Sequence, residues 1–317
     1  MQVLVAGGAG FIGVNLVRAL LSRGDHVVVL DDYSTGWPAL DVAAYTLGTD
    51  ANLAFIQTDV AQPKTDFWPD RTYDAIINLA CPASPIHYQK NRIKTLRTSV
   101  VGTLRLLELA QAQKAVFVQA STSEVYGDPD VHPQPETYRG NVNPIGPRAC
   151  YDEGKRAAET LCFDFLRDRG VNVRVARIFN TYGPMMHPDD GRLVSEFICR
   201  ALEGEPLTIN GSGEQTRSLC YIDDLVQGLL RLLDLTPAVV PINLGNPEEF
   251  TVNQVARLVL AATGSSSTIT HAALPTDDPR KRQPDLYYAR SHLGWAPLVP
   301  FVDGLERTIR YFRGVLA

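Results

Sequence analysis

Residues 2–13, QVLVAGGAGFIG, set the architecture of this chain. Residues 2–6 are apolar almost without interruption, which predicts a short strand buried on both faces. Glycines follow at positions 7, 10 and 13, and residues 11–23 predict an amphipathic helix. A glycine turn between a strand and a helix lets the backbone approach a pyrophosphate at the helix N-terminus. The turn therefore predicts a dinucleotide site formed by Gly7, Gly10, Phe11, Ile12 and Gly13.

A carboxylate at the end of the second strand indicates which dinucleotide binds. HVVVL, residues 26–30, predicts that strand, and Asp31 follows it, 18 residues after Gly13. An acid at this place accepts hydrogen bonds from the ribose hydroxyls and repels a 2′-phosphate, so the sequence favours NAD over NADP. The alternative is a glycine turn that binds no ligand, beside a surface aspartate.

Two further strand ends give weaker signals for the same site. Asp59 and Val60 close the third predicted strand, where an adenine edge would lie. Leu79, Ala80 and Cys81 close the fourth, on the pyrophosphate side. Each is explained equally well as a plain strand end, so these residues add support only in combination with the glycine turn.

Strands and helices alternate along most of the chain. Further short apolar segments predict strands at residues 54–59, 74–80, 115–121, 172–178 and 241–245. Helical segments are predicted at residues 93–112, 152–169 and 193–203. This alternation predicts an α/β fold with a doubly wound, parallel Rossmann sheet. Because proline and glycine become frequent after residue 180, we expect an NAD-binding domain over residues 1–180, with returning elements near 220–246. We expect a smaller C-terminal lobe, residues 181–317, to form most of the substrate site.

Composition narrows the class of protein. The chain has 317 residues, 45% hydrophobic and 21% charged, with a net charge of −5, and it offers no basic surface for nucleic acid or an anionic membrane. Its five cysteines are scattered without a CxxC pair, so we expect reduced thiols and no metal site. The first strand begins at Gln2, and no apolar run approaches the ~18 residues of a membrane span. We therefore expect no signal segment, no membrane span and a cytoplasmic location.

A second group of residues suits proton and hydride transfer. Tyr151 and Lys155 are four residues apart, so a helix places both on one face. A lysine ammonium beside a phenol lowers the pKa of the phenol, and the tyrosine can then take a proton from a sugar hydroxyl while hydride passes to NAD. Thr122 ends a strand and can hydrogen-bond the same hydroxyl. YxxxK alone is common on amphipathic helices, so this prediction depends on the glycine turn and Thr122 as well.

Longer motifs identify a family. They are ACPASP (80–85), TSE (122–124), GNVNPIGPR (140–148), YDEGKR (151–156), RIFNTYGP (177–184) and DPRKR (278–282). Through them the chain resembles the extended short-chain dehydrogenase/reductase family, which acts on nucleotide sugars, from Gly7 to Phe312. Within that family it most resembles the members that decarboxylate UDP-glucuronate to UDP-xylose.

The resemblance implies a mechanism in three steps. Tyr151 takes the C4 hydroxyl proton while the C4 hydride passes to NAD, which gives a 4-keto sugar. Carbon dioxide then leaves from C5, C5 is protonated, and the hydride returns to C4, so no net redox change occurs. Ser123 and Glu124 face the glucuronyl ring in the family, and Arg282 binds the carboxylate or directs protonation at C5. A carboxylate at Glu124 would repel the substrate carboxylate until carbon dioxide leaves.

The resemblance also implies binding residues and a partner. For the cofactor it adds Asp32, Ser34, Thr35, Gly36 and Thr98. For the UDP-sugar it implies Pro85, Asn180, Thr181, Arg192, Leu207, Ile209, Arg217, Tyr221 and Arg282. Arg192 and Arg217 also suit a diphosphate by their chemistry, because guanidinium binds phosphate oxygens bidentately, although a surface ion pair explains either arginine too. A homodimer through the helices at 93–112 and 152–169 is implied as well.

The residues leave three other functions open. A nucleotide-sugar 4,6-dehydratase of the same family uses an acid after the threonine, where this chain has Ser123. A 4-epimerase usually carries a small residue where Glu124 stands. A non-catalytic NAD-sensing protein would have little need for Thr122, Tyr151 and Lys155 together.

One departure from the family pattern is Met185, which follows Tyr-Gly-Pro where an arginine is usual. We expect this change to weaken a contact near the sugar or the phosphates.

Overall fold

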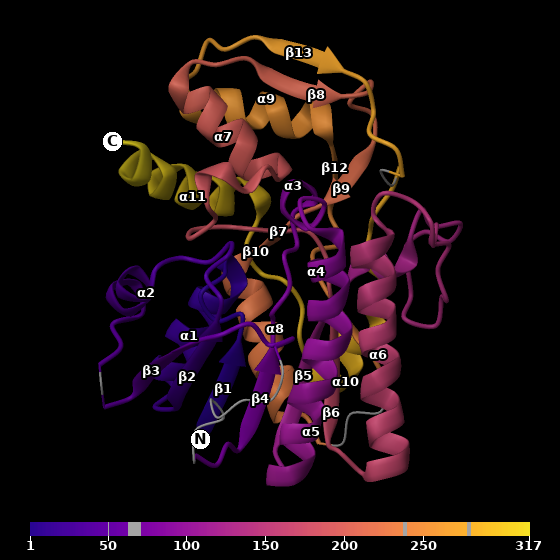
Figure 1. The fold of residues 1–317 in the computed structure, drawn as a ribbon. Helices are drawn as coiled ribbons and strands as arrows, with labels where there is room; N and C mark the ends of the chain where they lie inside the picture. The colour runs from indigo at the N-terminus through magenta and orange to yellow at the C-terminus, as the bar shows by residue number, and fades with distance from the viewer. Residues whose placement is uncertain (50, 63–70, 237–239, 278–279) are drawn as a thin grey trace.

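The computed structural model describes residues 1–49, 51–62, 71–236, 240–277 and 280–317. Asp278 and Pro279 of the DPRKR motif lie outside these residues. A parallel sheet occupies the centre of the molecule, in the order β11-β6-β5-β4-β1-β2-β3, and confirms the predicted fold class (Figure 1). Its strands are β1 Gln2–Ala6, β2 His26–Asp31, β3 Leu53–Gln57, β4 Ala75–Asn78, β5 Val116–Thr122, β6 Val173–Ile178 and β11 Ile242–Leu244.

Alternation along β1 divides the core into two layers. Val3 and Val5 belong to the cluster with α1 and α8, whereas Leu4 and Ala6 pack with α5 and α6. Successive side chains of a strand point to opposite faces, so the unbroken apolar run of β1 reflects burial on both sides. The covering helices are α1 Phe11–Ser22, α8 Ile222–Asp234, α5 Thr103–Gln113 and α6 Ala149–Arg169.

The helix predicted over residues 93–112 is divided in the structure. α4 Arg92–Arg97 is joined to α5 by a π-helical turn, Thr98–Gly102. Gly102 allows the close approach of this turn to the segment after β3, because a Cβ atom there would lie 2.5 Å from Cγ2 of Val60. Such turns insert one residue into a helix and are frequent at functional sites. Sequence periodicity alone did not reveal the interruption.

The strand ends converge on one edge of the sheet. The glycine turn follows β1, Asp31 ends β2 and Thr122 ends β5. The strand order reverses between β1 and β4, and this is where doubly wound sheets bind their ligands. The topology therefore brings together motifs that lie more than a hundred residues apart in the sequence.

Most of the elements after β6 lie beyond that edge, whereas β11, α8 and α10 Tyr287–Leu293 return to the central sheet (Figure 1). The elements beyond the edge include three two-stranded sheets, β7 Thr181–Tyr182 with β10 Cys220–Tyr221, β9 Thr216–Ser218 with β12 Glu249–Thr251, and β8 Leu207–Asn210 with β13 Ile269–Ala272. The remaining helices are α2 Ala39–Thr46, α3 Pro85–Tyr88, α7 Leu193–Glu203, α9 Val252–Thr263 and α11 Phe301–Leu316. Among the described residues, no helix has the length and apolarity to cross a membrane.

Candidate active site

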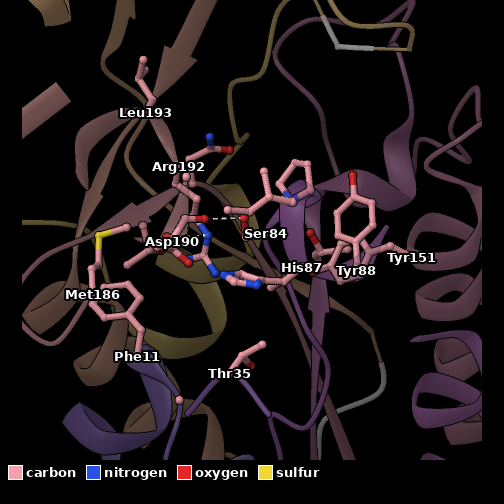
Figure 2. Close-up of a pocket in the computed structure, with 18 of the residues that line it drawn as sticks. Phe11, Thr35, Ser84, His87, Tyr88, Tyr151, Met186, Asp190, Arg192 and Leu193 are labelled. Carbon is pink, nitrogen blue, oxygen red and sulfur yellow. Dashed lines mark hydrogen bonds and ion pairs between the residues drawn. The ribbon is translucent and has the colours of Figure 1, made fainter. Parts of the chain in front are cut away.

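A cavity of about 750 Å³ lies where the strand ends meet the C-terminal elements (Figure 2). Its walls contain residues from the glycine turn, from the ends of β4 and β5, from α6 and from the C-terminal segments. Most sequence-predicted residues line it, namely Gly7, Gly10, Phe11, Ile12, Gly13, Ser34, Thr35, Gly36, Leu79, Cys81, Pro85, Thr122, Ser123, Glu124, Tyr151, Lys155, Asn180, Thr181, Arg192, Arg217 and Arg282. A volume of this size is typical of a ligand site.

Other predicted residues do not line the cavity in the described part of the chain. They are Asp31, Asp32, Asp59, Val60, Ala80, Thr98, Leu207, Ile209 and Tyr221. Leu207 and Ile209 are fully buried in the core, whereas Thr208 and Asn210 face the cavity, as alternation along β8 requires. Any contact of Leu207 or Ile209 with a base would therefore come from the backbone and not from the side chain.

The glycine turn has a shape that only glycine permits at two positions. Gly7 has φ of +77°, and a Cβ atom there would lie 2.7 Å from the backbone of Ala80. At Gly13 a Cβ atom would lie 2.3 Å from the carbonyl oxygen of Gly7. Gly10 caps α1 without any side-chain hydrogen bond, so the first N–H groups of the helix are free to face an anion. These features fit the pyrophosphate of a dinucleotide.

Asp31 connects the glycine turn to the loop that follows β2. Its carboxylate accepts a hydrogen bond from the Ala9 N–H at 3.0 Å and another from the Tyr33 N–H at 2.9 Å. Burial raises the pKa of Asp31, and these two bonds oppose the increase. The neighbouring Asp32 pairs with Lys94 of α4 at 2.5 Å. The sequence did not predict this lysine, because it is 62 residues away.

Tyr151 and Lys155 lie on one face of α6, near the end of β5. The Lys155 ammonium donates to the carbonyl of Ala120 at 2.8 Å, and its nitrogen is 5.8 Å from the centre of the Tyr151 ring. Burial lowers the pKa of Lys155 and raises the pKa of Tyr151. In the protein alone, the direction of the pKa change at the phenol is set by burial and not by the lysine charge on which the expectation was based. Desolvation dominates at this buried position, while a hydrogen bond from Thr122 lowers the pKa only in part.

Tyr88 is an additional aromatic residue in the site. Its ring is stacked on that of Tyr151, with centroids 5.0 Å apart and planes inclined by 6° (Figure 2). The side chain is buried, and its hydroxyl has no hydrogen-bond partner among the described residues. The stack fixes the plane of the Tyr151 ring. An aromatic residue shortly after the strand-end segment 79–81 is a weak signal that sequence analysis did not use.

Two arginines bind the Glu124 carboxylate. Oε2 lies 2.7 Å from Nη2 of Arg148 and 3.2 Å from Nη2 of Arg282, and Arg282 also donates to the carbonyl of Ser123. Burial alone would raise the pKa of Glu124, but Arg282 and then Arg148 lower it to about 2. Glu124 is therefore ionised at neutral pH. The sequence pattern does not point to this pairing of Arg148, because no spacing connects it to a residue 24 positions earlier.

Asp152 is a second buried acid beside this cluster, and we expect it to make stability depend on pH. Burial, followed by the charge of Glu124, raises the pKa of Asp152 from the usual 3.8 to about 8, although Arg148 and Arg282 oppose this. A carboxyl whose pKa is higher in the folded state favours folding less as the pH rises from the unfolded pKa of 3.8 to the folded pKa of about 8. Asp152→Asn should therefore stabilise the protein at pH 9 more than at pH 5.

Chemical denaturation at several pH values tests this expectation. Glu153→Gln is the matched control, because Glu153 is half-exposed in an ion pair with Arg156, and its effect should be small at every pH. A change in stability for Asp152→Asn that is the same at pH 5 and pH 9 would contradict the assignment.

An ion pair and a hydrogen bond lie on the part of the cavity wall formed by the segments before α3 and α7. Arg192 lies 3.2 Å from the Asp190 carboxylate, and the Ser84 hydroxyl donates to the carbonyl of Asp190 at 2.5 Å (Figure 2). The Ser84 contact joins the segment before α3 to the segment before α7. Arg217 is buried, and its Nη1 donates to the carbonyl of Thr216 at 2.8 Å.

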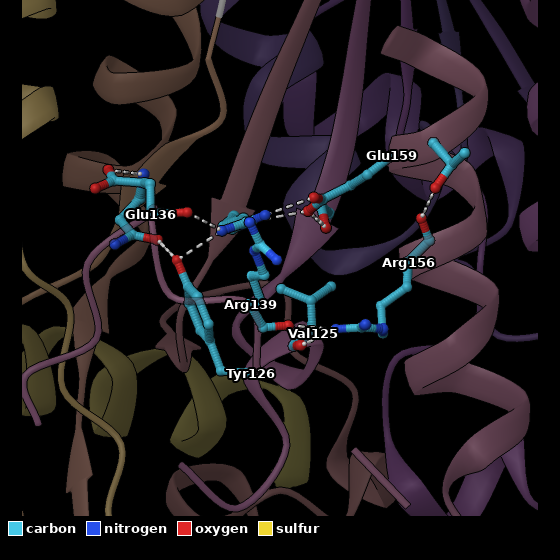
Figure 3. Close-up of polar contacts among 10 residues, drawn as sticks. Val125, Tyr126, Glu136, Arg139, Arg156 and Glu159 are labelled. Carbon is cyan, nitrogen blue, oxygen red and sulfur yellow. Dashed lines mark hydrogen bonds and ion pairs between the residues drawn. The ribbon is translucent and has the colours of Figure 1, made fainter. Parts of the chain in front are cut away.

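A buried polar network lies behind the end of β5 (Figure 3). Arg177 donates two hydrogen bonds to Glu159, at 2.9 and 2.7 Å, and Glu159 also accepts one from Ser121 at 2.5 Å. Arg177 further donates to the Tyr126 hydroxyl and to the carbonyl of Glu136, both at 3.0 Å. Since Ser121 directly precedes Thr122, this network fixes the strand end that presents the site.

Known proteins are similar to this chain in both sequence and fold. The NAD dependent epimerase/dehydratase family matches residues 3–245. UDP-glucuronic acid decarboxylase 1 of Xenopus tropicalis is 50% identical over 312 residues, which cover 98% of this chain and 72% of that protein.

Two solved structures extend the comparison. The dTDP-glucose 4,6-dehydratase DesIV of Streptomyces venezuelae, with NAD and TYD bound, has a TM-score of 0.90 and 28% identity, covering 99% of this chain and 97% of that one. The UDP-glucuronic acid 4-epimerase of Bacillus cereus, in complex with UDP-glucuronic acid and NAD, has a TM-score of 0.87 and 29% identity, covering 99% and 100%.

The chain belongs to the NAD dependent epimerase/dehydratase family. The resemblance to the extended short-chain dehydrogenase/reductases is thereby confirmed, and so is NAD as the cofactor. The family contains enzymes with different outcomes at the sugar ring, so its name alone does not decide the reaction.

Proposed function

We propose that this chain decarboxylates UDP-glucuronate to UDP-xylose, with NAD as a recycled cofactor. The observation that carries the proposal is the ionised Glu124 carboxylate, paired with Arg148 and Arg282 in the cavity that also contains Tyr151. The half-identical decarboxylase relatives support the same reaction. A 4,6-dehydratase would need an acid at Ser123, whose side chain is a hydroxyl.

The chain's own groups can perform the proton transfers at C4. The chemistry supplied by bound NAD is reversible hydride transfer at that carbon. Tyr151 accepts the C4 hydroxyl proton and later returns it, while Thr122 hydrogen-bonds the same oxygen. Lys155 places a positive charge near the phenol through its bond to Ala120. Because burial disfavours phenolate at Tyr151, this positive charge is needed when the proton moves.

Decarboxylation depends on the charges around C5. The carboxyl group at C5 is β to the new ketone at C4. When carbon dioxide leaves, the electron pair of the broken C5–carboxyl bond passes to the ketone and forms an enolate. An ionised Glu124 near the substrate carboxylate disfavours the bound uronate and not the product, whose sugar ring has no carboxylate. Arg282 can contact the departing carboxylate or direct the proton to C5. One proton is taken up in each turnover.

Glu124→Gln should separate decarboxylation from oxidation. We expect decarboxylation to slow by about 10²-fold, because a preorganised charge is lost, while NADH and the 4-keto uronate still form. Rapid-quench analysis of sugar nucleotides together with NADH absorbance measures both steps. Glu153→Gln is the control for an acid-to-amide change at a half-exposed position. An unchanged rate of carbon dioxide release in Glu124→Gln would contradict the role of Glu124 in decarboxylation.

We propose that residues 181–317 bind most of the UDP-sugar and that residues 1–180 bind NAD, with α8 and β11 packing on the N-terminal part. Arg192, Arg217 and Asn180 line the cavity and suit the diphosphate. Thr208 and Asn210 offer polar groups to the base.

The first test is an incubation of purified protein with UDP-glucuronate and NAD, followed by mass spectrometry and proton NMR of the sugar nucleotide. Loss of carbon dioxide, a UDP-pentose product and no net NADH would support the proposal. An unchanged mass with an axial C4 hydroxyl would make the chain an epimerase. Water loss from a UDP- or dTDP-hexose would make it a dehydratase, and no turnover with any of them would favour an NAD-sensing protein.

We also propose a homodimer and a cytoplasmic location. Ile93 and Leu96 of α4 are exposed apolar side chains, 76% and 42% accessible, beside α6. This surface supports pairing of two copies, which light scattering would detect as twice the chain mass of 34.8 kDa. All five cysteines are free thiols, which is typical of a reducing compartment.

A further inference from the structure

Trp37 forms hydrogen bonds to two separate segments that line the cavity. Its backbone N–H donates to the carbonyl of Ala9, inside the glycine turn, at 2.9 Å. Its indole Nε1 donates to the carbonyl of Met185 at 2.8 Å, 148 positions further along the chain. The indole ring also contacts the ring of His187, with centroids 5.0 Å apart. Trp37, Met185 and His187 all line the cavity.

The partner of the indole is itself in an unusual conformation. Met185 has φ of +71°, which is uncommon for a residue other than glycine and requires support from its surroundings. Two hydrogen bonds hold this segment, one from Trp37 to Met185 and one from Asn15 of α1 to the carbonyl of Pro184 at 3.1 Å. Both come from elements next to the glycine turn. The segment continues through Asp190 to Arg192, where the diphosphate of the sugar nucleotide is proposed to bind.

We propose that Trp37 is a cofactor-retaining residue that links release of NAD to occupancy of the substrate side. The glycine turn and residues 185–187 both line one cavity, and Trp37 is hydrogen-bonded to both segments. If these two segments move apart when NAD leaves, the indole bond to Met185 must break together with the bond from Asn15 to Pro184. The retention role rests on NAD binding alone, and the link to the substrate side rests on the proposed function.

Exchange of NAD without turnover tests the retention role. Holoenzyme loaded with isotopically labelled NAD is mixed with excess unlabelled NAD, and the label that stays bound is followed over time. Trp37→Phe keeps an aromatic ring against His187 but removes the N–H donor, so exchange should accelerate by about fivefold, the effect of one hydrogen bond. Trp37→Ala should accelerate it further.

Leu40→Ala is the matched control, because Leu40 lies three residues away and is 83% exposed. It should exchange at the wild-type rate. If Trp37→Ala fails to fold, Trp37→Phe decides the question alone. Exchange in Trp37→Phe at the wild-type rate would overturn the proposal.

UDP is the probe for the link to the substrate side. Saturating UDP should slow NAD exchange in the wild type, and it should slow it distinctly less in Trp37→Phe. An equal effect of UDP in both proteins would overturn the link and leave the retention role to the first experiment. Neither readout requires decarboxylation, so failure of the proposed reaction with UDP-glucuronate would be recognised separately.

Discussion

Tyr151→Phe is expected to lower kcat for UDP-xylose formation by about 10²- to 10⁴-fold, the range of a lost general base. The substitution removes one oxygen and retains the ring that is stacked on Tyr88. Packing and folding stability should therefore change little, and the loss should appear in both oxidation at C4 and overall turnover. Single-turnover assays with UDP-glucuronate, read by NADH absorbance and by NMR of the product, measure both.

The control for this substitution is Tyr287→Phe, because Tyr287 is 69% exposed on α10. It should leave kcat at the wild-type value. Thermal unfolding of Tyr151→Phe excludes a folding defect as the cause of any lost activity. A rate within tenfold of wild type would show that another group accepts the C4 proton.

Arg177→Met is expected to lower the free energy of unfolding by about 3–5 kcal/mol. The substitution leaves Glu159 charged in a buried site without its bidentate partner, and breaking a buried ion pair from one side is strongly destabilising. The Tyr126 hydroxyl and the Glu136 carbonyl lose a donor as well. Equilibrium denaturation with urea gives the free energy directly.

The double variant Arg177→Met/Glu159→Leu gives a sharper test. Replacing a whole buried pair with apolar groups is often close to neutral, so the double variant should be more stable than Arg177→Met alone. Arg167→Met is the exposed control, because Arg167 pairs with Asp164 at the surface, and its effect should stay within about 0.5 kcal/mol. Equal losses at Arg177 and Arg167 would contradict a structural role for the buried network.

The sequence was sufficient for those parts of the fold that depend on local pattern. The glycine turn, the buried parallel strands and the Tyr151–Lys155 spacing each follow from period and residue type, and the structure has these elements. Their catalytic roles stay a prediction until the variants are measured. The break at Thr98–Gly102 was missed because a π-helical turn leaves the apolar pattern almost unchanged.

Contacts between distant segments were beyond sequence reasoning. Arg148 reaches Glu124, and Trp37 reaches Met185, through loop geometry that no spacing records. Burial of the Leu207 and Ile209 side chains could not be predicted, because only a known strand register shows which face of β8 is buried. The sign of the pKa change at Tyr151 also required burial, which a one-dimensional pattern does not give.

Asp31 has a consequence for anyone who wishes to change the cofactor preference of this enzyme. The carboxylate that would discriminate against a 2′-phosphate also accepts hydrogen bonds from the N–H groups of Ala9 and Tyr33, and so joins the glycine turn to the loop that follows β2. Replacing it with a neutral residue would remove the repulsion and loosen the pyrophosphate turn in the same step. Acceptance of NADP therefore has to be redesigned together with a new acceptor for those two N–H groups.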